Sequence, residues 1–275
     1  MGTLLGQEKK GFSEITTVAI DAALLAGQIL KGGFGTNFQI QSKRGTHNLV
    51  TEYDHKAEEA IIAYICKHIP NSAFLAEESG QRGQPLSETL LWIIDPLDGT
   101  VNFAHNIPFY SVSIGVEKNR ELLAGVVYVP ITEELFVAEK GRGAFLNGAP
   151  IHVSKEQQLI KSILATGFPY NLAENPSHCI EHFVDVLKMG IPIRRLGSAA
   201  IDFAYTAAGR FEGFFEVSLS PWDLAAGKLL VEEAGGRVTT WSGAPLNIHA
   251  EHTILATNGP IHKEAIALLD RHAAH

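Results

Sequence analysis

The sequence contains few cysteines and no excess of basic residues. Only Cys66 and Cys179 occur in 275 residues, and they stand far apart in helix-like patterns. A disulfide framework or a zinc site therefore has little support, and both thiols are expected to be buried. Lys and Arg total 22 against 30 Asp and Glu, a formal net charge of −8, so no broad basic surface for nucleic acid is expected.

Long apolar runs and a secretion signal are also lacking. The most apolar stretch, residues 18–30, is interrupted by Asp21 and Gln28, so we expect no membrane-spanning helix. Near the N-terminus, Lys9 and Lys10 follow the short apolar piece instead of preceding it, which is the wrong order for a signal peptide. These absences predict a cytoplasmic protein that does not enter a membrane.

Several catalytic motifs are missing. Neither a glycine-rich Walker loop nor a Gly-x-Ser-x-Gly elbow is present, so nucleotide hydrolysis by that loop and serine esterase activity are unsupported. The twelve histidines form no convincing ligand set. His249, His252, His272 and His275 lie in loop-like or terminal stretches, and each is expected to be solvated.

The patterns that are present predict helices and sheets in layers. Amphipathic spacing predicts a helix over residues 13–30 and a second from Thr51 to just before Pro70, with a polar, mobile loop at 36–47 between them. Short strand-like runs fill the middle of the chain, including an Asn-Gly hairpin turn, and strands alternate with helices after residue 160. We expect one catalytic domain, 1–275, with an N-terminal lobe of about 1–155 and a C-terminal lobe of about 156–275.

Acidic residues stand at the ends of the expected elements. The segment "WIIDPLDGTVNF" places Asp95 and Asp98 after an apolar strand, "AFLAEESG" ends in Glu77 and Glu78, and "SPWDLAAG" places Asp223 at the start of a helix. Asp and Gly are also ordinary turn residues, so an acidic turn is the plain alternative. Carboxylates at the carboxyl edge of a buried sheet nevertheless lie where ligands are usually held.

Such a group of carboxylates favours a bound divalent cation. Carboxylates brought together repel one another and raise each other's pKa values, and a cation relieves that repulsion. Because the set contains oxygen ligands and no thiol, Mg²⁺ suits it better than zinc or copper.

The same segments, with "LVTEYD" upstream and "EEAGG" downstream, resemble the inositol monophosphatase family of magnesium-dependent phosphatases over nearly the whole chain. The resemblance implies an α/β fold, the layered α/β/α/β/α sandwich, which is often found as a homodimer. It also implies two or three Mg²⁺ ions per active site, sensitivity to lithium, and a small phosphate ester as substrate. Water would attack phosphorus directly, activated by one ion while another stabilises the leaving oxygen.

The resemblance also assigns roles to individual positions. One ion would be held by Glu77, Asp95 and the carbonyl of Leu97, and a second by Asp95, Asp98 and Asp223. Thr100 and Asp54 would orient the attacking water, and Gly99 and Thr100 would offer backbone N–H groups to the phosphate. Two plain alternatives stay open: Asp54 as part of a helix capping box begun by Thr51, and Asp223 as a helix cap.

On the substrate side, the resemblance assigns the alcohol to Gly197, Ser198 and Ala199, with Glu216 accepting hydrogen bonds from its hydroxyls. A small-residue helix packed on a sheet is the alternative for the first three, and an exposed strand end for Glu216. Lys43 matches a family lysine near the metals, but a solvated lysine is equally consistent. Asn48 departs from the acid often found at its position, which weakens inference about this loop and any additional ion.

Two other classes of function compete with this prediction. A haloacid-dehalogenase-type phosphatase needs an aspartate two places before Asp98, where this chain has Pro96. A regulatory binding protein on the same scaffold is the second rival, although the acids needed for catalysis are present together. Inositol monophosphate is the leading substrate, with histidinol phosphate, fructose 1,6-bisphosphate, nucleotide 3′-phosphates and glycerol phosphates as alternatives.

Overall fold

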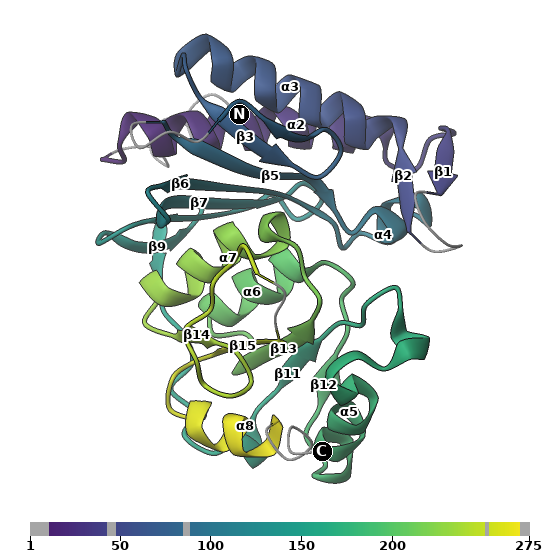
Figure 1. Cartoon of the computed structure of the whole chain (residues 1–275), viewed down its shortest axis with the longest axis vertical. Helices are drawn as coiled ribbons and strands as arrows, with labels where there is room; N and C mark the ends of the chain where they lie inside the picture. Colours follow the sequence, from purple (N-terminus) through teal and green to yellow (C-terminus); the bar gives the residue numbers. More distant parts are fainter. Residues whose placement is uncertain (1–10, 43–47, 85–88, 251–252, 270–275) are drawn as a thin grey trace.

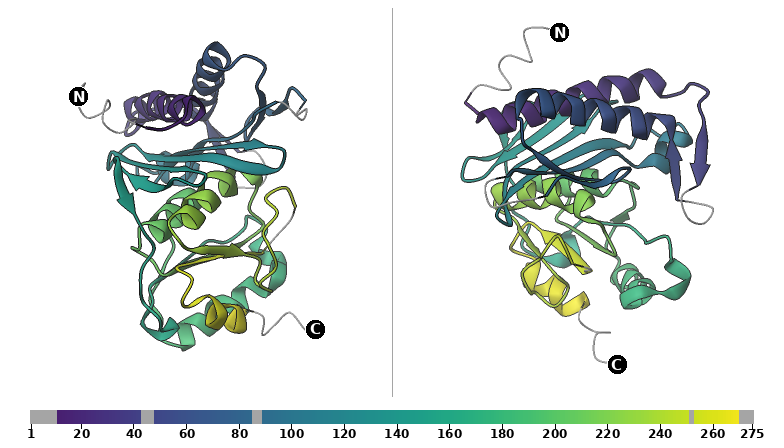
Figure 2. Two further views of the ribbon diagram at one scale, coloured as in Figure 1. Left: turned by 90° about the vertical axis from the view of Figure 1, so that its left-hand side faces the viewer. Right: turned by 45° about the horizontal axis from the view of Figure 1, so that its top comes forward.

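The chain folds into five stacked layers, as the computed structural model shows (Figure 1). It describes residues 11–42, 48–84, 89–250 and 253–269. A pair of helices covers the outer face of an eight-stranded sheet, a second pair fills the space between this sheet and a five-stranded sheet, and further helices cover the far side (Figure 2). The predicted α/β/α/β/α sandwich is therefore confirmed.

The elements are assigned to these layers as follows. The outer helices are α2 (Glu14–Gly33) and α3 (Glu52–His68), the central helices are α6 (Ala199–Ala207) and α7 (Pro221–Glu233), and the far helices are α5 (Cys179–Lys188) and α8 (His262–Leu269). The large sheet has the order β10 (Ala149–Ile151), β9 (Gly143–Leu146), β8 (Glu134–Glu139), β7 (Glu121–Val129), β6 (Ser111–Lys118), β5 (Leu91–Asp98), β3 (Ala73–Ala76), β4 (Gly80–Arg82). The small sheet has the order β12 (Ile193–Arg194), β11 (Leu164–Thr166), β13 (Gly213–Val217), β15 (Thr253–Thr257), β14 (Arg237–Thr239). Short α4 (Thr100–Ala104) follows β5, and β1 (Ile40–Ser42) pairs with β2 (Leu49–Thr51).

The two N-terminal helices begin where capping chemistry predicts. Ser13 is the N-cap of α2 and accepts a hydrogen bond from the Thr16 amide, while Thr51 caps α3. The expected loop at 36–47 is only partly a loop, because residues 40–42 form β1 against β2; residues 43–47 lie outside the described part. Strand β1 forms because it pairs with β2, whose residues lie seven or more positions further along the chain. The polar sequence of β1 itself gives no local signal for a strand.

Apolar side chains pack between all the layers. One buried cluster joins α2 and α3 to the large sheet, a second joins both sheets to α6 and α7, and a third joins the small sheet to α5 and α8. Helix α7 lies close against the large sheet: a Cβ on Gly115 would come within 2.5 Å of the Ala225 Cβ, and one on Gly125 within 2.8 Å of the Ala226 carbonyl. This close approach brings the start of α7 to the edge of β5.

The expected burial of both cysteines needs correction. Cys66 is exposed, because its neighbour Ile65 takes the buried face of α3, whereas Cys179 is buried as expected.

Helix α2 has the length and composition of a membrane span, with a mean hydropathy of 1.3 over an 18-residue window. Half of that window is buried within the protein, as in the core helices of folded domains, so it is weak evidence for a span.

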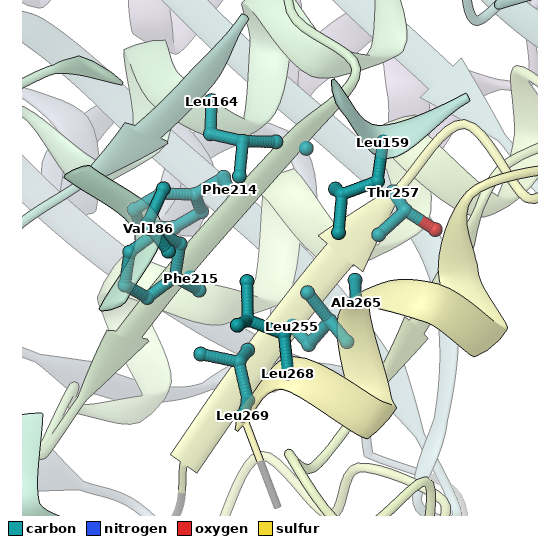
Figure 3. Close-up of a pocket in the computed structure, with 11 residues that line it drawn as sticks. Leu159, Leu164, Val186, Phe214, Phe215, Leu255, Thr257, Ala265, Leu268 and Leu269 are labelled. Atoms are coloured by element: carbon teal, nitrogen blue, oxygen red, sulfur yellow. The ribbon is translucent and has the colours of Figure 1, made fainter. Parts of the chain in front are cut away.

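The far layer encloses a small apolar cavity of about 10 Å³, between the small sheet and helices α5 and α8 (Figure 3). Leucine, valine, alanine and phenylalanine side chains line it, and Thr257 supplies the one hydroxyl in the lining. A space no larger than one water molecule and lined in this way is a packing gap. It lies on the opposite face of the small sheet from the acidic residues.

Candidate active site

The carboxyl ends of β3 and β5 place three of the predicted acids at one edge of the large sheet. These strands are parallel, with Ala76 opposite Ile94, and the Glu77 amide donates to the Ile94 carbonyl at 3.1 Å. Every residue of β5 is buried, as its apolar sequence predicts. The pairing of β5 with β6 shifts between Asp95 and Asp98, at the position of Pro96, which cannot donate to the ladder. This irregular strand end turns both aspartates into the same region.

Helix α7 brings a fourth acid to this edge. Asp223 lies in its first turn, and its Oδ2 accepts from the Ser220 amide at 2.7 Å. One oxygen from each of Asp95, Asp98 and Asp223 lies within 4.8 Å of the others. Ser220, and not Asp223, is the N-cap of α7; Asp223 closes the capping box three residues later and is also a member of the acidic cluster.

Backbone and hydroxyl donors hold the other aspartates. The Asp95 Oδ1 accepts from the Leu97 amide at 3.0 Å, and the Asp98 Oδ2 accepts from the Ser198 hydroxyl at 2.6 Å and the Ala200 amide at 2.7 Å. These hydrogen bonds fix the orientation of each carboxylate. Because a carboxylate offers about four lone-pair sites, each still has lone pairs with which to bind a cation.

The cluster is electrostatically unfavourable without a cation. Burial, followed by the charges of Glu77, Asp98 and Asp223, raises the pKa of Asp95 well above its ordinary value. Burial raises the pKa of Asp98 to about 6, although the Ser198 and Ala200 bonds oppose this. The pKa of Asp223 is raised well above its ordinary value by burial and by Asp98 and Glu77.

These residues fit a divalent cation. Among the described residues, no Lys or Arg forms an ion pair with Asp95, Asp98 or Asp223. All the side-chain donors are carboxylate oxygens, which suit hard ions such as Mg²⁺, and a cation offsets the mutual repulsion that raises their pKa values.

Beside the cluster, Asp54 and Thr100 are joined by a hydrogen bond. The Thr100 hydroxyl lies 3.0 Å from the Asp54 Oδ1 and 3.0 Å from the Leu97 carbonyl, and it gives its single proton to one of them at a time. The Asp54 Oδ2 accepts from the Thr51 amide at 2.7 Å and from its hydroxyl at 2.6 Å. Burial raises the pKa of Asp54, while its bonds to Thr51 and Thr100 lower it.

The turn at Gly99 lies against the segment before α6. Gly99 has φ of 96°, and a Cβ there would lie 2.8 Å from the Phe109 carbonyl, so only glycine fits. The Asn102 side-chain amide donates to the Phe109 carbonyl at 2.6 Å and to the Leu196 carbonyl at 2.8 Å. A Cβ on Gly197 would lie 3.0 Å from that amide nitrogen. The half-buried Gly99–Thr100 turn is thus clamped to the segment that contains Gly197.

The remaining predicted residues lie on α6 and β13. The Ser198 hydroxyl donates to Asp98, lies 3.2 Å from the Ser111 hydroxyl, and accepts from the Ile201 amide at 3.3 Å. Ala199 is buried in the first turn of α6.

Glu216 is buried, not exposed at a strand end, and burial followed by the charge of Asp98 raises its pKa to about 8. Its Oε2 lies 2.2 Å from where a Cβ on Gly167 would stand.

Sequence reasoning missed two acids near this site. Glu58 on α3 is buried, and its Oε2 accepts from the Glu78 amide at 2.9 Å, which ties the end of β3 to the helix. Asp202 on α6 is buried beside Glu216 and Asp98, whose charges add to burial in raising its pKa well above the ordinary value. The sequence signal that could have found Asp202 is an acid inside the otherwise apolar segment "AAIDFA". No such signal marks Glu58, which lies in a helix with several other charged residues.

The sequence also led to expectations for Lys43 and for four histidines in loops or near the C-terminus. His249 is only partly exposed, because its Nε2 lies 2.8 Å from the buried Glu117 carboxylate. A loop histidine that meets a strand 132 residues away gives no sequence signal for that contact. Lys43, His252, His272 and His275 lie outside the described residues.

Comparisons with known proteins agree with this fold. The model of the inositol monophosphatase family matches residues 12–274. The inositol-1-monophosphatase of Synechocystis is 44% identical over 247 residues, covering 90% of this chain and 85% of the relative. The Nus factor SuhB of Escherichia coli is 40% identical over 251 residues, covering 91% and 93%. The solved inositol monophosphatase of Anabaena superposes with a TM-score of 0.82 at 41% identity, covering 93% and 94%. The chain belongs to the inositol monophosphatase family, a family of metal-dependent phosphatases.

Proposed function

We propose that the protein is a Mg²⁺-dependent phosphomonoesterase that converts inositol monophosphate to inositol and phosphate. The observation that carries this proposal is the meeting of Asp95, Asp98 and Asp223 within 4.8 Å, beside the Thr100–Asp54 hydrogen bond. Family membership supports the reaction class, and a name such as inositol-1-monophosphatase on the Synechocystis relative supports the substrate.

The residues that would hold the ions follow the family pattern. Glu77, Asp95 and the Leu97 carbonyl would hold one Mg²⁺, and Asp95, Asp98 and Asp223 a second, with a third ion as an additional expectation. When bound, the ions neutralise the carboxylates, acidify a water and stabilise negative charge on the leaving oxygen. The Leu97 carbonyl is a reasonable ligand even though Thr100 lies within hydrogen-bond distance of it, because a carbonyl oxygen has two lone pairs.

The chain's own residues position the water and the phosphate. When the Thr100 hydroxyl donates to the Asp54 Oδ1, its oxygen is left to accept a hydrogen bond from the attacking water. The backbone N–H groups at Gly99 and Thr100 begin α4 and have no partner within that helix, so they can donate to phosphate oxygens. Glu216 would meet the alcohol half, opposite the phosphate, with Gly197, Ser198 and Ala199 forming the adjoining wall.

A regulatory role is the second candidate, because a relative 40% identical carries the name Nus factor SuhB. The joint presence of the four metal-ligand carboxylates, Asp54 and Thr100 favours retained catalysis, and a binding role is compatible with it. We further propose a cytoplasmic homodimer, as the family resemblance implies. Light scattering of the purified protein measures the oligomeric state.

Phosphate release from a panel of phosphomonoesters tests the proposal. We expect inositol 1-phosphate to be hydrolysed in Mg²⁺, activity to vanish in EDTA, and lithium to inhibit. Histidinol phosphate, fructose 1,6-bisphosphate, nucleotide 3′-phosphates and glycerol phosphates complete the panel. Asp185→Asn, on the far helix α5, is the matched control for Asp95→Asn, which should lose nearly all turnover. Absence of phosphate release from every ester in Mg²⁺ would favour the binding role.

A further inference from the structure

The carboxyl group of Asp202 is buried without a hydrogen-bond partner for one of its oxygens. The residue is 1% exposed, and its Oδ1 contacts no donor among the described residues. Buried polar atoms in native proteins are nearly always paired, so an unpaired one calls for a specific explanation. A functional ligand is one such explanation, because the carboxyl then gains its partner only when the ligand binds.

The packing of α6 on the small sheet places Asp202 beside Glu216. The rings of Phe203 on α6 and Phe214 on β13 meet edge to face, with centroids 4.9 Å apart. Alternate residues of a strand share a face, so Glu216 points to the same side as Phe214, toward α6. Phe215 and Val217 belong to the apolar cluster on the opposite side of this sheet.

The surroundings also place the pair next to the acidic cluster. The Asp98 carboxylate caps the start of α6 through Ser198 and Ala200, one turn before Asp202. Gly167 lacks the Cβ that would collide with the Glu216 carboxylate, which leaves room for that carboxylate at the end of β11. Asp202 and Glu216 thus lie near Asp98, a member of the acidic cluster, whose charge acts on both of them.

The two carboxyl groups form a wall that can hydrogen-bond to a ligand, since both side chains are buried and polar. Burial, Glu216 and Asp98 raise the pKa of Asp202 well above its ordinary value, and the pKa of Glu216 is raised to about 8, with only the exposed Arg195 opposing both shifts. Protonated carboxyl groups both donate and accept hydrogen bonds. Such a wall suits uncharged hydroxyl groups, which can both donate to it and accept from it.

We infer that Asp202 is a specificity-determining residue that binds, together with Glu216, the hydroxyl groups of a polyol monophosphate. The inference rests on the proposed function, since it names the part of the substrate that this end of the site selects. The opposing explanation is structural: a buried water pairs with Asp202 permanently, and the residue contributes nothing to selectivity.

Selectivity between two substrates distinguishes these explanations. Wild type, Asp202→Asn and Asp202→Leu are assayed in Mg²⁺ with inositol 1-phosphate and with p-nitrophenyl phosphate, which has no hydroxyl on its ring. For Asp202→Leu we expect kcat/KM for the inositol ester to fall about 10-fold or more relative to the aryl ester, because a lost hydroxyl contact acts on one substrate only. Asp202→Asn, which still donates and accepts, should restore most of the ratio. An equal fall for both substrates overturns the inference.

Stability without substrate gives an independent readout. If the ligand alone pairs Asp202, Asp202→Leu should unfold at the wild-type temperature or above it, because an unpaired buried carboxyl has been removed. The matched control is Thr206→Val, one turn further along α6, whose buried hydroxyl already donates to the Asp202 carbonyl at 2.8 Å. It should lower the unfolding temperature and leave the substrate ratio unchanged. The inference about Asp202 is overturned if Asp202→Leu loses as much stability as the control, or fails to fold. If instead the wild-type protein is inactive on both esters, the proposed function is overturned.

Discussion

Asp54 uses its two carboxylate oxygens for different tasks. Its Oδ2 accepts from the Thr51 amide at 2.7 Å and completes the capping box of α3, while its Oδ1 lies 3.0 Å from the Thr100 hydroxyl. The two interpretations that the sequence left open are therefore compatible. The helix cap holds the carboxylate rigidly in the direction in which it meets Thr100.

Replacing Asp54 should separate catalysis from folding. We expect Asp54→Asn to lower kcat about 100-fold to 10,000-fold, the usual contribution of a positioned acid-base group, with Mg²⁺ affinity little changed. Loss of the charged cap should also cost about 1 kcal/mol of unfolding free energy. Steady-state kinetics and urea unfolding measure both effects.

Thr51→Ala is the control for that variant, because it removes the capping hydroxyl and leaves the carboxylate in place. It should cost a similar amount of stability and reduce kcat far less. If Thr51→Ala and Asp54→Asn reduce kcat equally, Asp54 acts only through the helix.

Glu58 should affect metal binding from outside the cluster. Glu58→Ala leaves the Glu78 amide without its acceptor at 2.9 Å, which should cost about 1–3 kcal/mol of unfolding free energy and loosen the strand end that carries Glu77. We expect the Mg²⁺ concentration for half-maximal activity to rise while kcat at saturating Mg²⁺ stays near wild type. Glu58→Gln keeps an acceptor and should behave more like wild type, and Glu59→Ala, on the exposed face of α3, should have no effect. An unchanged Mg²⁺ requirement in Glu58→Ala would contradict this role.

Local patterns predicted the elements that carry the main acids. Asp95 and Asp98 follow a strand that is apolar on both faces, and Thr51 and Ser220 begin helices through capping boxes that close three residues later. These signals lie within a few residues of each other, so hydrophobic period and capping chemistry are sufficient to find them.

Contacts between distant segments were not predictable in the same way. In the sequence, Glu58 is one of several acids on a charged helix, and only the fold brings the Glu78 amide at the end of β3 against it. His249 likewise lies in a loop, and only the fold places Glu117 beside it. Asp202 gave a local signal, an acid in an apolar helix, but its neighbour Glu216 lies on a different element. Burial of polar side chains depends on tertiary packing, which the sequence pattern alone does not give.

Gly167 should be required for the position of Glu216. A Cβ at this residue would stand 2.2 Å from the Glu216 Oε2, so Gly167→Ala must displace the carboxylate. We expect KM for inositol 1-phosphate to rise roughly 10-fold or more, as a misplaced binding group typically causes, with p-nitrophenyl phosphate little affected. Gly32→Ala, in a helix with no atom within 4 Å of the added Cβ, is the control and should keep wild-type kinetics. Wild-type KM in Gly167→Ala would show that Glu216 does not contact the alcohol.

His262 should make the protein less stable in mild acid. Its Nε2 lies 3.0 Å from the Thr239 hydroxyl and its Nδ1 2.8 Å from the Thr257 hydroxyl, and burial lowers its pKa from 6.5 to about 4. The unfolded chain therefore binds this proton below pH 6.5 while the folded protein does not. Its stabilising contribution is complete above pH 6.5 and declines as the pH falls toward 4.

Urea unfolding between pH 7.5 and 4.5 measures this decline. In His262→Gln the slope of unfolding free energy against pH should be smaller in this range. His152→Gln, at an exposed position, should keep the wild-type slope. Equal slopes in the wild type and in both variants would mean that His262 is not the responsible group.

The central claim is that Asp95, Asp98 and Asp223 form a site for divalent cations. A crystal structure with Mn²⁺ in place of Mg²⁺ tests it most directly, because the anomalous signal of manganese locates the ions independently of any assay. We predict manganese peaks between these carboxylates, at least one of them bound to Asp95, and loss of the peaks in crystals of Asp95→Asn. Crystals soaked in excess Mn²⁺ that show no peak at these carboxylates, or peaks only elsewhere on the protein, would contradict the account.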